Sequence, residues 1–222
     1  MKRFFLLLVL AFLSLSSTEA ETAREKRAPV WVYLETVPGS LTADQLKAKL
    51  PPIQDLNNTA RFIMGGMVYG WKFNYTPSDL TRKVTEYFEL SPIKEIETGD
   101  PRLTISEITP EYPRLSCTAI FTIDDSLTRW ELYWSSVLFK SANGRGYAER
   151  TDEVEGIRKA YADAVRDAVR SYARKLEKNK PKEIRGEVLL RDDPRLFTDG
   201  GKFVADIKVY INMQQLIPYT TF

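Results

Sequence analysis

Apolar and polar residues alternate along several parts of this chain, a pattern typical of β-strands that bury one face. Runs rich in β-branched and aromatic residues predict strands over 29–37, 62–75, 103–109 and 115–123. Two further alternating runs, 184–191 and 207–211, are joined by a polar segment and predict a β-hairpin near the C-terminus. The segment 128–139 stays open between a strand, which its alternating apolar positions favour, and a helix, which the spacing of Trp130, Trp134 and Leu138 also fits.

Apolar residues at steps of three and four predict a long helix over 153–178. Asp152 is a suitable N-cap for it, and Pro181 ends it. Shorter helices are predicted over 42–50 and from Thr76 to Phe88, because Thr76 is followed by a proline and an acid at capping positions. Residues 51–60 are predicted to form a loop, and residues 143–146 a flexible turn.

These elements predict an α+β fold, because strands and helices follow one another without the regular alternation of parallel α/β proteins. We expect an antiparallel sheet of about six to seven strands, packed against the long C-terminal helix and one or two shorter helices, and ending in the β-hairpin. Residues 21–222 are predicted to form one domain. Two units, 21–150 and 151–222, are the alternative, but no flexible linker separates them.

The N-terminal residues have the pattern of a secretory signal peptide. Lys2 and Arg3 precede an apolar run from Phe4 to Leu15, and small residues lead to a predicted cut after Ala20. The mature chain would then start at Glu21 and act in a periplasm or in the medium. A permanent membrane helix is the weaker alternative, because spanning a bilayer takes about 20 apolar residues.

Composition narrows the possible chemistry. The chain contains no histidine, which excludes Ser-His-Asp and Cys-His catalytic groups and zinc sites that need imidazole. Its one cysteine, Cys117, lies in an apolar run and is predicted to be a buried thiol. The formal net charge of +2 falls to +1 once residues 1–20 are removed, so no basic surface for nucleic acid is expected. We expect no cofactor and no metal site.

Two groups of residues are candidates for contact with a ligand or partner. The first is an aromatic row on the strand predicted over 62–75, made of Tyr69, Trp71, Phe73 and Tyr75. Its polar opposite face favours burial of these rings, with a partner interface and a ligand-stacking platform as the alternatives. The second is the basic ridge Arg166, Arg170 and Arg174 on the long helix, which could hold an acidic partner or a phosphate. The neighbouring acids Asp163 and Asp167 can neutralise this ridge, which favours an ordinary solvated helix face over such binding.

The sequence therefore favours an exported, non-enzymatic interaction or structural module of a cell envelope, with an envelope protein as partner and no stable membrane insertion after signal cleavage. The alternative is a periplasmic ligand-binding protein that uses the aromatic strand face. A third hypothesis is a carboxylate-dependent hydrolase, which would need a cleft with two acids, one of them with a raised pKa. The oligomeric state is not predicted.

Overall fold

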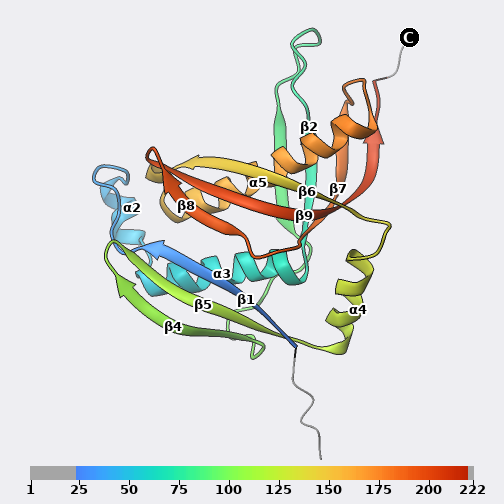
Figure 1. Cartoon of the computed structure of the whole chain (residues 1–222). Helices are drawn as coiled ribbons and strands as arrows, with labels where there is room; N and C mark the ends of the chain where they lie inside the picture. The colour runs from blue at the N-terminus through green and yellow to red at the C-terminus, as the bar shows by residue number, and fades with distance from the viewer. Residues whose placement is uncertain (1–23, 220–222) are drawn as a thin grey trace, which may run out of the picture.

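The computed structural model describes residues 24–219, and the predicted signal peptide lies outside these residues. Within them the chain forms two antiparallel sheets and several helices (Figure 1). In chain order the elements are β1 (Arg24–Tyr33), α2 (Ala43–Ala48), α3 (Pro52–Val68), β2 (Trp71–Thr76), β3 (Tyr87–Pro92), β4 (Leu103–Glu111), β5 (Arg114–Ile123), α4 (Asp125–Trp134), β6 (Lys140–Glu149), η1 (Arg150–Asp152), α5 (Glu153–Leu176), β7 (Glu183–Leu190), β8 (Arg195–Asp199) and β9 (Lys202–Ile217). The predicted α+β class, the long helix and the final hairpin are confirmed.

The smaller sheet has the strand order β1-β5-β4. Its central strand β5 alternates between buried and partly buried residues along its whole length, because one face covers the core. Cys117 is on this buried face, as the sequence predicts.

The larger sheet has the order β3-β2-β7-β9-β6, and β8 adds to β9. The segment 192–201, which we expected to be a plain polar loop, therefore contains a strand of its own. β7 and β9 pair antiparallel and form the predicted hairpin.

Helix α5 packs closely against β6, and glycine makes this close approach possible. A Cβ built on Gly144 would lie 1.9 Å from the carbonyl oxygen of Ala164, and one built on Gly146 would lie 2.1 Å from the Ala164 nitrogen. Residues 143–146 are thus part of a strand, and the prediction of a flexible turn is wrong. The glycines remove side-chain bulk under the helix and do not mark a bend.

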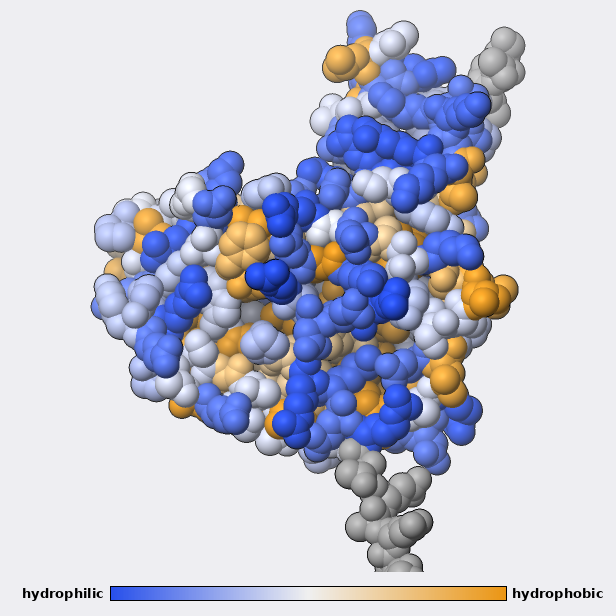
Figure 2. All heavy atoms as spheres, in the orientation of Figure 1, coloured by the Kyte–Doolittle hydropathy of each residue, from blue (hydrophilic) through white to orange (hydrophobic). Residues whose placement is uncertain are grey.

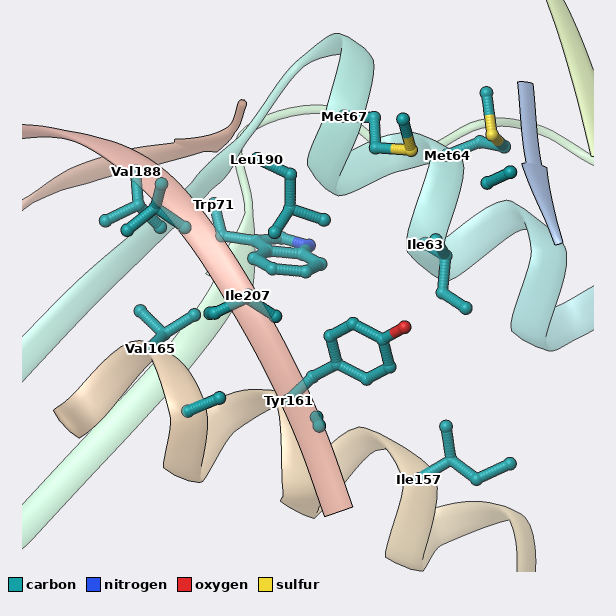
Figure 3. Close-up of a cluster of buried hydrophobic side chains, with 14 of the residues drawn as sticks. Ile63, Met64, Met67, Trp71, Ile157, Tyr161, Val165, Val188, Leu190 and Ile207 are labelled. Carbon is teal, nitrogen blue, oxygen red and sulfur yellow. The ribbon is translucent and has the colours of Figure 1, made fainter. Parts of the chain in front are cut away.

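Helix α3 contacts β1 and β5 of the smaller sheet, β7 of the larger sheet, and α5. Trp71 of β2 lies among these elements. Its ring stacks on Phe62 of α3 with centroids 5.0 Å apart and meets the edge of Tyr161 of α5 at 6.3 Å. Figure 3 shows Trp71 beside Leu190, with Tyr161 approaching from α5. Both sheets therefore share one continuous hydrophobic core.

The predicted strand over 62–75 is wrong in its first half, and so is the loop over 51–60, because residues 52–68 form α3. Every residue from Ile63 to Val68 is buried, so the apolar run there is continuous and resembles a strand, although Leu56, Ala60, Ile63 and Met67 do have helical spacing. Gly66 is needed there because a Cβ would lie 2.3 Å from the Trp71 ring. Gly70, at φ 86°, then makes the turn into β2, where the predicted alternation starts.

The predicted helix from Thr76 to Phe88 is also wrong, because this segment forms a loop and then β3. Asp79, which we expected to support a helix start, closes a turn instead. Its carboxylate accepts hydrogen bonds from the backbone N–H of Arg82 at 3.2 Å and from the Arg82 guanidinium at 2.6 Å. The same polar residues that cap helices also form such turns.

The strand favoured for 128–139 is wrong, because the segment is helix, α4, up to Trp134 and a turn over 135–139. Asp124 caps it by accepting a hydrogen bond from the N–H of Leu127 at 2.9 Å. Within residues 24–219, no helix has the length and apolar character required to cross a membrane.

Candidate functional site

The aromatic row is part of the core. Trp71, Phe73 and Tyr75 lie on β2 and are almost fully buried, while Tyr69 is the C-terminal cap of α3 and does not belong to the strand. Phe62 of α3 and Tyr161 of α5 pack on Trp71, and Phe88 of β3 packs on Phe73 and Tyr75. Burial of Trp71, Phe73 and Tyr75 is what the structure shows.

The three arginines of the basic ridge lie in two different environments, an ion-pair cluster and a cavity. Arg166 forms ion pairs with Glu86, at 3.3 Å, and with Asp163. Arg170 and Arg174 line a cavity of about 200 Å³ beside the C-terminal end of α5, together with Tyr75. The structure thus brings three of the seven predicted contact residues to one place. Lys178 and Lys180 also line this cavity, and cations there also stabilise the carbonyl end of the helix.

A larger cavity, of about 390 Å³, lies between α3 and α5, and we call it the α3–α5 pocket. Phe62 and Trp71 contribute to its apolar lining. β3 and the segment after it close another side, and the lining residues are Asn58, Arg61, Phe62, Gly65, Trp71, Leu90, Pro92, Lys94, Glu95, Ile96, Glu155, Arg158, Lys159 and Ala162. Of the predicted site residues, Trp71 is the one that reaches this pocket.

A group of exposed apolar side chains lies on α4 and the turn that follows it. These residues, which we call the α4 patch, are Leu132, Tyr133, Val137 and Leu138, with exposed fractions of 62%, 47%, 87% and 73%. Figure 2 shows hydrophobic side chains at the right-hand edge of the molecule, where Figure 1 draws α4. Soluble proteins seldom leave such groups uncovered unless they bind something.

The α4 patch rests on a rigid aromatic base. Trp134 is fully buried, and its ring centroid is 4.9 Å from that of Phe139 and 5.8 Å from that of Trp130. Tyr133 packs on Trp130 and on Phe139. The exposed residues therefore project from a packed surface, which lowers the entropy cost of binding.

Exposed cations lie before and after the α4 patch. β1 begins beside α4 (Figure 1), where Arg24 and Lys26 bind Glu131 at 3.5 and 2.9 Å. Arg129 lies one helical turn before the patch and Lys140 just after it; both are exposed, and neither has a carboxylate within 4.0 Å among residues 24–219. A partner with carboxylates at the edge of an apolar surface would complement this arrangement.

Among the described residues, Asp55 is a carboxyl with the raised pKa that the hydrolase hypothesis requires. Burial raises the pKa of Asp55, the nearby Lys49 lowers it, and the charge of Glu153 raises it further. Glu153, however, accepts hydrogen bonds from the Val37 backbone N–H at 2.7 Å and from the Ser40 hydroxyl at 2.8 Å, so it holds the segment after β1. Neither acid lines the cavities described above.

The part of the chain that the structure describes contains no group of three or more acidic or cysteine side chains arranged to hold a metal ion. Sequence reasoning missed both the α3–α5 pocket and the α4 patch. The pocket joins residues about 100 positions apart and leaves no local signal. The α4 patch did leave a local sequence signal. On a helix that buries Leu127 and Trp134, the position of Leu132 falls on a different face.

These features define a two-sheet α+β protein with a buried aromatic centre, one cavity beside that centre and one exposed apolar patch. A protein-family model that carries no functional description matches residues 14–219. A protein of Treponema pallidum (strain Nichols), described as an uncharacterized protein, is 35% identical over 194 residues, which are 87% of this chain and 82% of that protein. The chain belongs to the family that this model describes. No solved structure matches it.

Proposed function

We propose that the mature chain is an exported, non-enzymatic interaction module of the cell envelope, and that the α4 patch is its contact surface. The observation that carries this proposal is the exposure of Leu132, Val137 and Leu138 on a rigid aromatic base. The fully buried centre of a protein interface is more apolar than the rest of the surface, so side chains of this kind suit such a centre.

The partner is a protein with an apolar surface edged by aspartate or glutamate. Arg129 and Lys140 flank the patch as uncompensated cations among the described residues, so a carboxylate rim would gain attraction on approach. A basic rim would be repelled. This charge pattern distinguishes binding of an acidic partner from non-specific hydrophobic association of the patch.

A photo-crosslinking side chain at position 137 tests the contact in cells that produce the protein. The matched control is position 80, because Leu80 is also an almost fully exposed apolar residue but lies in the loop between β2 and β3. We expect one envelope protein to be crosslinked from position 137 and not from position 80. Crosslinks to a second copy of this chain, crosslinks to lipid, or the same products from both positions contradict the proposed partner.

Export is tested separately from the contact. The run of basic, apolar and small residues before Ala20 supports cleavage there. N-terminal sequencing of the protein from the periplasm or the medium should start at Glu21. Recovery of the chain from the cytosol with its N-terminal segment intact contradicts this part of the proposal.

A further inference from the structure

The α3–α5 pocket has a preorganised aromatic base, formed by Phe62 packed on Trp71 and Tyr161. Phe62 is half-buried, and one face of its ring stacks on Trp71 at an interplanar angle of 23°. Tyr161 holds the same ring from its edge, with centroids 5.8 Å apart. The Phe62 ring is therefore fixed in position. The Arg158 guanidinium lies over the same ring, 5.7 Å from its centroid, so a flat apolar group packs on the ring beside Arg158.

Gly65 opens the pocket on the α3 side. It is buried, yet a Cβ built on it would meet no atom within 4 Å, because its missing side chain faces the cavity. The next residue, Gly66, is the opposite case, since its Cβ would collide with Trp71. The two neighbouring glycines thus serve different purposes: Gly66 allows the core to close, and Gly65 leaves space.

The charges that line the pocket are mainly positive. Four cations, Arg61, Lys94, Arg158 and Lys159, face two carboxylates, Glu95 and Glu155. Lys159 binds Asp152 at 2.8 Å, and Arg158 lies 4.0 Å from Glu155. Arg61 and Lys94 have no carboxylate within 4.0 Å among residues 24–219.

Arg61 is oriented as an anion-binding group. Its guanidinium donates hydrogen bonds to the side-chain oxygens of Asn58 and Thr98, which are neutral acceptors. These bonds fix its direction without cancelling its charge, and they leave further N–H donors unused. A carboxylate can pair with such a group in bidentate geometry.

We infer that the α3–α5 pocket binds a small aromatic carboxylate, whose ring packs on Phe62 and whose anionic group pairs with Arg61. The cavity volume of about 390 Å³ lies within the range of small-molecule sites. Lys94, on the segment after β3, also lines the pocket, and its ammonium lies 5.1 Å from the centroid of the Tyr69 ring. This site is separate from the α4 patch and does not depend on the function proposed for it.

Titration of the purified protein with 2-naphthoate at low ionic strength, followed by calorimetry or by the shifts of the ligand's NMR signals, tests the inference. We expect a dissociation constant of about 1 mM or tighter, as ligand efficiency suggests for a molecule of this size. The uncharged analogue 2-naphthalenemethanol should bind at least about tenfold more weakly, and acetate, which lacks the ring, should show no binding.

Two variants separate the contributions of space and charge. Gly65→Leu should fill the cavity and weaken naphthoate binding at least about tenfold without lowering the melting temperature, because the new side chain has open space. Arg61→Gln should weaken naphthoate but leave naphthalenemethanol unchanged, whereas the control Arg27→Gln, on an exposed arginine outside the pocket, should change neither. Absence of naphthoate binding to the unaltered protein, or equal binding by Gly65→Leu, overturns the inference.

Discussion

Replacing Gly144 by alanine probes the contact on which the larger sheet depends. Gly144 lies on β6 directly under α5, and its added Cβ would meet the Ala164 carbonyl oxygen at 1.9 Å and the Ala164 carbonyl carbon at 2.9 Å. Ordinary contacts of a Cβ start near 3.4 Å, so the helix and the strand would have to separate by about 1.5 Å. The obstacle is helix backbone, which cannot rotate away as a side chain can.

The expected cost follows from this geometry. Overpacking of a core usually costs about 1–3 kcal/mol, and a collision with backbone belongs at the upper end or above it. Separation of α5 from β6 would also loosen the packing of neighbouring core residues such as Ala168, whose Cβ lies 3.0 Å from the added atom. We therefore expect Gly144→Ala to lose at least about 3 kcal/mol of unfolding free energy, equal to a fall of about 6–12 °C in melting temperature.

Urea and thermal denaturation followed by far-UV circular dichroism measure this change. Gly65→Ala is the matched control, because its Cβ has open space and alanine is the better helix former, so it should gain up to about 1 kcal/mol. If Gly144→Ala unfolds within about 0.5 kcal/mol of the unaltered protein, the close contact between β6 and α5 is not real, and the reasoning about the glycines fails.

Three further results are expected. Trp71→Ala should lose about 3–5 kcal/mol in the same denaturation assay, because it removes the largest ring of a fully buried cluster. Asp55→Asn should be more stable than the unaltered protein at pH 7 and equally stable below pH 3.8. Burial raises the folded-state pKa of the Asp55 carboxyl above 3.8, so the unaltered protein loses stability as the pH rises through this folded-state pKa, and asparagine does not titrate. Melting curves between pH 3 and pH 7 measure the difference. Cys117 should react with iodoacetamide at pH 8 far more slowly in the folded than in the unfolded chain, because burial raises its thiol pKa to about 11.

Elements that bury one regular face could be predicted from the sequence. β5 shows its alternation over every residue from Arg114 to Ile123, and α5 shows steps of three and four from Ile157 onward. In both elements one face packs against the core and the other face is exposed or partly buried. The apolar residues of the strand therefore recur every two positions, and those of the helix every three or four. The hairpin of β7 and β9 follows the same rule.

Elements buried on several sides could not be predicted in this way. The end of α3 is enclosed by the smaller sheet, β7 and α5, so its residues 63–68 are all buried and form a continuous apolar run. The helical spacing of Leu56, Ala60 and Ile63 before this run was overlooked. The structural role of glycine could not be predicted either. Gly144 and Gly146 allow β6 to pack closely against α5, but in the local sequence they look the same as glycines of a turn. The burial of Trp71 followed from the polar opposite face of its strand, but its neighbour Phe62 comes from a helix that was not predicted.

The candidate sites depended on these same elements. Arg170 and Arg174 were found from helical spacing, and both line the cavity beside the end of α5. The α4 patch was hidden because the favoured strand would have buried alternate residues of 128–139, whereas the helix leaves Leu132 in solvent. Tertiary packing decided between the two periods.

The affinity of the chain for the protein crosslinked from position 137 tests the central claim most directly. With both proteins purified, the variant with Leu132→Asp and Leu138→Asp should bind that partner at least about tenfold more weakly than the unaltered chain, since it loses two apolar anchors and places carboxylates against an acidic rim. The control Leu80→Asp should bind normally, and the melting temperatures should agree. Unchanged affinity of the double variant would contradict a function that works through the α4 patch.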